Sequence, residues 1–232
     1  MMKTIGLIGG MSWESTVPYY QYINTRVKQR LGGLHSARLL LYSVDFHDIE
    51  LLQHADRWDD AGRLLADAAR TLETAGADCV VLCTNTMHKV APAIAAAVAV
   101  PLLHIADATA AAVLQRGIRR VGLLGTRFTM EQDFYRCRLQ AHGIEVLIPE
   151  ARDREIIHSV IYEELCLGIV EPASRAQYRE IIERLVGRGA EGIILGCTEI
   201  AMLISADDAS VALFDTAELH ATAAVDFALD IR

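Results

Sequence analysis

The chain has 232 residues, of which 52% are hydrophobic and 22% charged, and this balance excludes an intrinsically disordered protein. Its 22 basic and 30 acidic residues give a formal charge of −8, and the basic residues form no long run. A negative chain of this kind lacks the electrostatic features of a nucleic-acid-binding protein and of a protein that docks on anionic membranes.

Short apolar runs alternate with longer amphipathic stretches along the whole chain. The runs predict strands at Thr4–Ile8, Leu39–Val44, Cys79–Cys83, Leu102–Ile105, Val121–Leu124, Val146–Ile148, Ile193–Leu195 and Val211–Phe214. Continuous apolar runs are typical of parallel strands that are buried on both faces. The clearest helical stretches are Pro18–Leu31, Trp58–Ala75, Ala173–Arg188 and Glu218–Ile231. This alternation predicts an α/β fold with right-handed crossovers.

An internal repeat divides the chain. The segment 4–10 returns as 120–126, and the segment 75–84 returns as 188–198 with one additional glycine before its cysteine. We therefore predict two pseudo-symmetric α/β domains, each a four-stranded parallel sheet flanked by helices. The first comprises residues 1–116 with a returning helix at 217–232, and the second comprises residues 117–216. Ligands of such sheets bind beyond the carboxyl ends of the strands, so we expect the active site in the interdomain cleft.

Two cysteine–threonine pairs, Cys83-Thr84 and Cys197-Thr198, follow apolar strands at equivalent places in the repeat. A thiol between a strand end and a helix N-terminus feels the positive end of the helix dipole, which predicts a lowered thiol pKa. Hydroxyl, amide and backbone N–H donors of the following Thr84 and Asn85 suit a carboxylate ligand. A buried strand cysteine followed by a helix cap would explain either pair alone. Two equivalent pairs favour a function.

Other features give weaker indications. The glycine turn in Gly6–Ser12 does not follow the G-x-G-x-x-G pattern of a dinucleotide site, but it would let the backbone N–H groups of Met11 and Ser12 approach a ligand. A helix cap at Ser12 explains the same turn equally well. The pair Glu163-Glu164 is interpreted as a solvated acidic pair that opens a helical stretch. The histidines lack the spacing of a metal site, so no metal ligand is predicted.

The cysteines, at positions 79, 83, 137, 166 and 197, form no C-x-x-C pair and are too few for a disulfide framework. Cys79 and Cys137 are interpreted as packing residues. The amino terminus reads as a buried strand and not as a signal peptide, and Pro92, Pro101 and Asp107 interrupt the longest apolar stretch. We therefore expect no membrane span and a cytoplasmic protein with reduced thiols.

Three segments together resemble the Asp/Glu racemase superfamily of cofactor-independent enzymes, and the resemblance covers essentially the whole chain. They are Gly6–Thr16, Cys83–His88 and Gly196–Glu199. The first two are similar to the aspartate racemase branch, and the second is similar to the broad-specificity amino-acid racemases of enterobacteria. The resemblance implies two-base racemisation of an amino acid, with Cys83 and Cys197 alternating as thiolate and thiol. It implies no pyridoxal phosphate or other cofactor, and it allows a homodimer.

The resemblance also implies the residues that bind the substrate. Donors of Thr84, Asn85 and Thr198 would hold the negative charge that develops on the substrate carboxylate. Glu164 would face the α-ammonium group. The other residues expected in the pocket are Met11, Ser12, Gln53, Thr86 and Glu199.

The chain departs from the aspartate racemases where they bind a side-chain carboxylate. Those enzymes carry an Arg and a Lys in the segments aligned with Asp48–Gln53 and Tyr162–Gly168, where this chain has Leu51 and Cys166 and no basic residue. We therefore predict broad specificity for neutral amino acids. The alternatives are an aspartate/glutamate racemase, another superfamily isomerase of the maleate isomerase or hydantoin racemase type, and a non-catalytic two-lobed small-molecule-binding protein.

Overall fold

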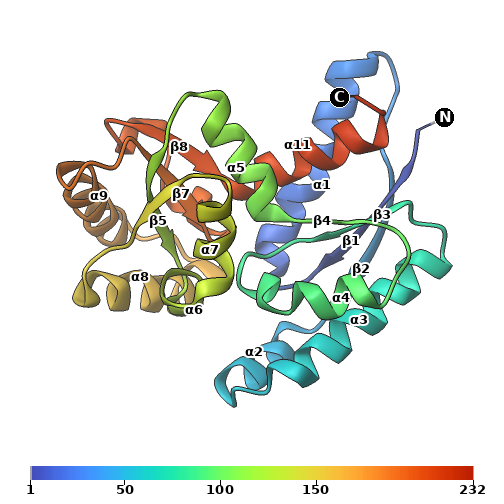
Figure 1. The fold of residues 1–232 in the computed structure, drawn as a ribbon, viewed down its shortest axis with the longest axis horizontal. Coiled ribbons are helices and arrows are strands. Elements are labelled where there is room, and N and C mark those ends of the chain that lie inside the picture. The colour runs from blue at the N-terminus through green and yellow to red at the C-terminus, as the bar shows by residue number, and fades with distance from the viewer. Residues whose placement is uncertain (1, 232) are drawn as a thin grey trace. The chain divides into compact units, whose positions relative to one another are not determined.

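The computed structural model describes residues 2–231, which divide into two compact units (Figure 1). The first unit comprises the described residues up to Ile105 together with those from His220 onward, and the second runs from Ala106 to Leu219. The second unit is therefore an insertion in the first. The chain returns to the first unit within helix α11 (Thr216–Ala228).

The first unit contains one parallel sheet with the strand order β2-β1-β3-β4. Its strands are β1 (Thr4–Gly9), β2 (Arg38–Ser43), β3 (Cys79–Leu82) and β4 (Leu102–Leu103). Besides the returning part of α11, its helical segments are α1 (Trp13–Leu31), α2 (Phe46–His54), α3 (Trp58–Thr74), η1 (Thr86–Val90) and α4 (Ala91–Ala96).

The second unit repeats this sheet with the strand order β6-β5-β7-β8, again all parallel. Its strands are β5 (Arg120–Gly125), β6 (Glu145–Leu147), β7 (Gly192–Gly196) and β8 (Ala212–Asp215). Its helical segments are α5 (Ile105–Gln115), α6 (Arg127–Glu131), α7 (Asp133–Ala141), α8 (Ala151–Glu163), η2 (Leu165–Leu167), α9 (Pro172–Gly187), α10 (Ile200–Leu203) and η3 (Ala206–Asp208). The predicted α/β class with two four-stranded parallel sheets is confirmed.

Helix α11 is shifted by two or three residues at each end from the predicted Glu218–Ile231, and two other helix boundaries differ in ways that bear on the site. Helix α1 begins at Trp13 and not at Pro18, because Ser12 caps it and accepts a hydrogen bond from the N–H of Ser15 at 3.4 Å. The acidic pair Glu163-Glu164 closes α8 and does not open a helix, since Glu164 is the C-cap residue. None of the described helices is both long enough and apolar enough to cross a lipid bilayer.

The glycine that recurs in the first strand of each unit is required by close packing. A Cβ atom on Gly6 would lie 2.8 Å from the Cβ atom of Ala77 and 3.3 Å from that of Leu72 on α3, and one on Gly122 would lie 2.9 Å from Cδ1 and 3.3 Å from Cβ of Leu185 on α9. Contacts this short are tighter than those of nearly all real Cβ atoms, so a side chain at either position would push the strand away from its covering helix. The repeated glycines therefore set the distance between sheet and helix in both units.

Candidate functional site

The first cysteine–threonine pair lies at the carboxyl end of β3. The N–H of Cys83 donates to the carbonyl oxygen of Ile8 at 2.9 Å, and the N–H of Thr84 donates to that of Leu82 at 2.8 Å. The thiol of Cys83 is buried, and its Sγ lies 3.8 Å from the carbonyl oxygen of Val81. The backbone N–H of Thr84 is among the donors that the sequence predicts for a carboxylate ligand. That assignment is wrong, because this N–H is bonded within the turn.

Other predicted site residues of the first unit gather at the same edge of the sheet. Met11 and Ser12 follow β1, which pairs in parallel with β3. The turns that follow the two strands therefore lie next to each other at the carboxyl edge of the sheet. Gln53 comes from α2, and its Nε2 donates to Sδ of Met87 at 3.0 Å. Asn85 directly precedes η1 and, like Met11, Ser12 and Gln53, is buried. Thr86, the first residue of η1, is buried as well.

The second pair lies at the carboxyl end of β7, the equivalent strand of the second unit. The thiol of Cys197 donates to Oε2 of Glu199 at 2.9 Å, and the hydroxyl of Thr198 donates to the same oxygen at 3.0 Å. All three side chains are buried. The additional glycine of this half, Gly196, ends the strand, where a Cβ atom would lie 2.7 Å from the carbonyl oxygen of Leu124. Cys197 therefore stands one residue further along its strand than Cys83 does.

The pKa of both thiols is raised, whereas their place between a strand end and a helix N-terminus predicts a lowered pKa. Burial raises the pKa of Cys83, and burial together with the negative charge of Glu199 raises the pKa of Cys197. The helical segments that follow are short, α10 with 4 residues and η1 with 5, so few peptide dipoles are aligned toward either sulfur. Desolvation therefore outweighs the dipole, and both cysteines are thiols at neutral pH.

Glu164 closes α8, and its carboxylate acts electrostatically on Tyr178 of α9. Its Oε1 accepts a hydrogen bond from the hydroxyl of Ser174 at 2.9 Å, while its Oε2 is buried and has no hydrogen-bond partner among the described residues. Burial raises the pKa of Tyr178, and Cys197, Glu164 and Cys166, which are negative when ionised, raise it further. The hydroxyl of Tyr178 itself donates to the carbonyl oxygen of Ile157 at 3.1 Å. Nothing in the sequence singled out Tyr178, which reads as an ordinary apolar position of a helix.

The other cysteines differ in their surroundings. Cys79 is buried in β3, as expected, and burial raises its pKa to about 12. Cys137 is exposed on α7, so its interpretation as a packing residue is wrong. All five are free thiols. Within residues 2–231 there is no group of three or more side chains that could hold a metal ion.

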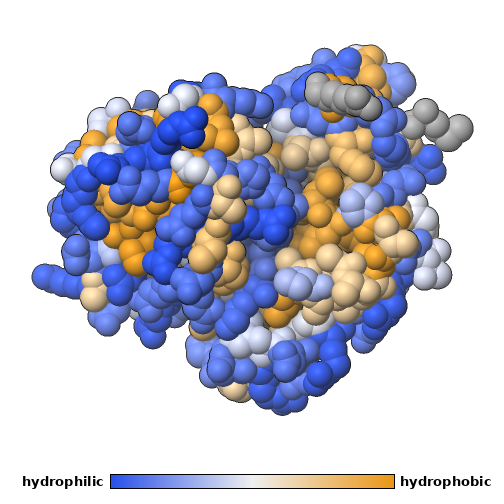
Figure 2. Space-filling model, viewed as in Figure 1, coloured by the Kyte–Doolittle hydropathy of each residue, from blue (hydrophilic) through white to orange (hydrophobic). Residues whose placement is uncertain are grey.

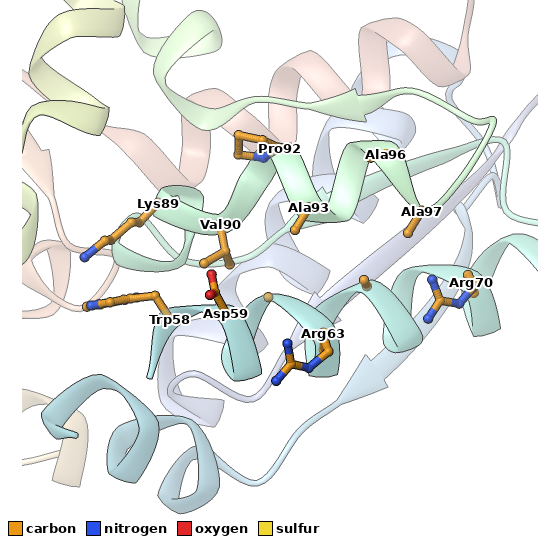
Figure 3. Close-up of a pocket in the computed structure, with 12 residues that line it drawn as sticks. Trp58, Asp59, Arg63, Arg70, Lys89, Val90, Pro92, Ala93, Ala96 and Ala97 are labelled. Carbon is orange, nitrogen blue, oxygen red and sulfur yellow. The ribbon is translucent and has the colours of Figure 1, made fainter. Parts of the chain in front are cut away.

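A groove of about 650 Å³ lies on the first unit, apart from the predicted site residues. It runs between α3 and the segment of η1 and α4, with Lys89 and Trp58 at one end (Figure 3). Figure 2 shows apolar side chains gathered over α4 and β4 beside it. Nζ of Lys89 lies 3.7 Å from the centre of the Trp58 ring, and Arg63 and Arg70 each pair with an aspartate on their own helix. Each of these three cationic side chains therefore already contacts a neighbouring side chain of the groove or of its own helix.

Comparisons with known proteins identify the family. The model of the Asp/Glu/Hydantoin racemase family matches residues 8–224. The broad specificity amino-acid racemase RacX of Bacillus subtilis (strain 168) is 24% identical over 230 residues, which cover 95% of this chain and 96% of that protein.

Two solved structures are similar over nearly the whole chain. One, from Yersinia pestis and provisionally described as an Asp/Glu racemase, is 60% identical with a TM-score of 0.91, and the match covers 98% of this chain and 100% of that one. Another, an aspartate racemase homologue from Pyrococcus horikoshii OT3, is 36% identical with a TM-score of 0.83 and the same coverage. The chain belongs to the Asp/Glu/hydantoin racemase family.

Proposed function

We propose that the chain is an amino-acid racemase that works without pyridoxal phosphate and uses Cys83 and Cys197 as its acid–base pair. The observation that carries this proposal is a buried thiol at the end of the equivalent strand in each of two repeated sheets. Racemisation requires one group to remove the α-proton and another to deliver a proton to the opposite face. One thiolate and one thiol meet that requirement, and they exchange roles when the reaction runs backward.

Glu199 is proposed to accept the proton that leaves Cys197. The thiol already donates to this carboxylate at 2.9 Å, so transfer along that hydrogen bond gives a thiolate next to a neutral carboxyl group. The thiolate takes the α-proton from the substrate, and the thiol of Cys83 gives its own proton to the other face. The enzyme is left with a thiol at Cys197 and a thiolate at Cys83, which is the form that acts on the opposite enantiomer.

The remaining site residues are proposed to bind the amino-acid backbone. Hydroxyl and amide donors of Thr84, Asn85 and Thr86 would stabilise the charge that develops on the substrate carboxylate. The hydroxyl of Thr198, which donates to Glu199, would turn to the substrate once Glu199 has taken up the proton of Cys197. The α-ammonium group of the substrate would give the buried Oε2 of Glu164 the hydrogen-bond donor that the described residues do not supply. Met11, Ser12 and Gln53 complete the proposed pocket.

We propose that the substrates are neutral amino acids of moderate length, and similarity to a broad specificity racemase supports a permissive pocket. Leu165 is buried in the apolar cluster that contains Cys197, and Cys166 packs against that cluster. A substrate carboxylate there would lose hydration without gaining a cation. Arg57 pairs with Asp60, and Lys89 lies over Trp58, so neither compensates from these positions.

The expected result is that homoserine, methionine or leucine has a higher kcat/KM than aspartate or glutamate. The measurement is kcat/KM for each amino acid, made side by side at neutral pH. An apolar pocket distinguishes neutral side chains only weakly, by roughly 1–3 kcal/mol per methylene group, so several neutral substrates should react. A value for aspartate or glutamate tenfold above that of the best neutral substrate would contradict this specificity and support an acidic amino-acid racemase.

Exchange of the α-proton tests the proposed reaction itself. The protein is incubated with each L-amino acid in deuterated water, and both loss of the α-proton signal and appearance of the D-enantiomer are followed. A racemase gives both, whereas a non-catalytic binding protein gives neither. An isomerase of unsaturated diacids would also leave amino acids unchanged, so a completely negative screen would reject the proposal.

We also propose that the enzyme is a homodimer, because large apolar side chains are exposed on an edge strand and on one helix face of the first unit. Strand β2 lies at the edge of its sheet, and Leu41 on it is 54% exposed. On α1, Trp13, Val17 and Tyr20 share one helix face and are exposed as well. Sedimentation should show a dimer at micromolar concentration that L41K weakens, while L167K, at an exposed position of the second unit, leaves it intact. A wild-type monomer would contradict the proposal.

The proposed compartment is the cytoplasm. All five cysteines are free thiols, as a reducing compartment would keep them.

A further inference from the structure

A cluster of histidines in the first unit borders the turn that carries Cys83. The ring centres of His88 and His104 are 4.4 Å apart, and those of His88 and His220 are 5.9 Å apart. His88 comes from η1 and His220 from α11, and both side chains are buried. The proposed reaction gives these rings no proton to carry, so their function has to follow from the groups that they contact.

The contacts of His88 fix which of its ring nitrogens carries the proton. Nε2 lies 3.2 Å from the backbone nitrogen of Ile105, which is a donor, so Nε2 has to be the unprotonated acceptor. Nδ1 lies 2.7 Å from the carbonyl oxygen of Thr84, which is an acceptor, so Nδ1 has to carry the proton. His88 is therefore a neutral imidazole protonated on Nδ1, and a second proton on Nε2 would oppose the N–H of Ile105.

His220 has the opposite tautomer. Its Nε2 lies 2.8 Å from the carbonyl oxygen of Leu103 and has to donate, while its Nδ1 lies 3.0 Å from the hydroxyl of Tyr19 and has to accept. Burial lowers the pKa of His220 to about 4, so this ring is neutral too. The two rings are hydrogen-bonded to the backbone on either side of His104. His220 donates to the carbonyl oxygen of Leu103, and His88 accepts from the N–H of Ile105.

The hydrogen bond to Thr84 has a geometric consequence for the turn. In a trans peptide the carbonyl group and the following N–H point in opposite directions. His88 holds the carbonyl of Thr84 toward itself, and it thereby also fixes the direction of the N–H of Asn85. The side chains of Thr84 and Asn85 are those that we have assigned to the substrate carboxylate.

We propose that His88 is a positioning residue for the racemase reaction, which holds the Thr84–Asn85 peptide in the orientation that binds the developing enediolate. This inference rests on the proposed function. His88 acts through Thr84 and donates no proton to the substrate. The geometry predicts that the Nδ1 donor matters for turnover, whereas the contact of Nε2 with Ile105 matters mainly for stability.

Two substitutions separate these contacts. An asparagine side chain can donate to the carbonyl four residues earlier, as Asn24 does to Tyr20 at 2.9 Å in α1. H88N should therefore keep the bond to Thr84 and lose the contact with Ile105, and its kcat should stay within a few fold of wild type. H88L loses both contacts, and its kcat should fall by roughly 10–100-fold with little change in KM, since a misplaced donor costs transition-state stabilisation.

Y19F is the matched control, because it removes a hydrogen bond from the same cluster without touching Thr84. It should lower the melting temperature and leave kcat unchanged. Protein labelled with ¹⁵N-histidine gives a readout that needs no activity: NMR should find His88 protonated on Nδ1 and His220 on Nε2. Rescue of kcat by H88N relative to H88L, together with these two tautomers, would support the proposal.

Three results would overturn it. They are a kcat for H88L equal to that of wild type, a kcat for H88N as low as that of H88L in folded protein, and a proton on Nε2 of His88. Each leaves wild-type activity intact, so each is distinct from failure of the proposed function. Absence of α-proton exchange in the wild-type protein would reject the racemase reaction and this role together.

Discussion

Replacing either Cys83 or Cys197 by serine is expected to lower racemase turnover by about 10²–10⁴-fold, the range for loss of a positioned acid–base group. A serine hydroxyl is a far weaker acid than a thiol and does not ionise near neutral pH. The free energy of unfolding should change by no more than about 1 kcal/mol, because the side chains have nearly the same shape. Since enantiomers have equal free energies, kcat/KM has to fall equally from the L and D sides.

Isotope exchange makes this prediction sharper. In the proposed mechanism, the thiol that each variant keeps still reaches one face of the α-carbon. C83S and C197S should therefore exchange the α-proton of opposite enantiomers in deuterated water without inverting them. C137S, which changes the exposed cysteine of α7, should behave as wild type. Substantial racemisation by C83S or C197S would contradict the two-thiol mechanism.

Replacing Glu199 by glutamine should lower kcat by roughly 10–100-fold, because an uncharged amide cannot accept the proton of Cys197. The same change removes a negative charge that raises the pKa of Cys197. The pKa of this thiol should therefore fall in E199Q, and its thiolate should form at a lower pH than in the wild type. The measurement is the rate at which iodoacetamide modifies Cys197 as a function of pH, followed by mass spectrometry of the peptide.

A matched control for E199Q is E183Q, which makes the same change at an exposed position of α9 in the same unit. It should alter neither kcat nor the alkylation of Cys197. If E199Q keeps the wild-type kcat, Glu199 is not the proton acceptor. If alkylation of Cys197 instead shifts to higher pH, the charge of Glu199 does not act on the thiol as its contact indicates.

The strands could be predicted from the sequence because burial on both faces leaves a continuous apolar run. Strands β1, β3 and β7 are buried along their whole length, and each was expected within a residue or two of its position. Helix starts were harder to place. The amphipathic stretch predicted from Pro18 onward is longer in the structure, where α1 starts after the Ser12 cap and contains Pro18 inside the helix.

The chemistry of the candidate site was less accessible to sequence reasoning. The spacing of the repeat located Cys83 and Cys197, but a spacing carries no information on desolvation, and desolvation decides the direction of both thiol pKa shifts. The bond between Cys197 and Glu199 joins residues two positions apart in a turn, where no periodicity applies. The tautomer of His88 depends on Ile105, which is 17 residues away in the chain.

The insertion of the second unit has a consequence for the order of folding during synthesis. The second unit is continuous in sequence and is complete once Leu219 has left the ribosome. The first unit still lacks the segment that begins at His220, whose ring bonds to Tyr19 across 201 positions and to Leu103 across 117. Contacts that span so much chain form late. The first unit is therefore the first to be synthesised and the last to complete its fold. Domains of a nascent chain usually fold in the opposite order, with the amino-terminal one first.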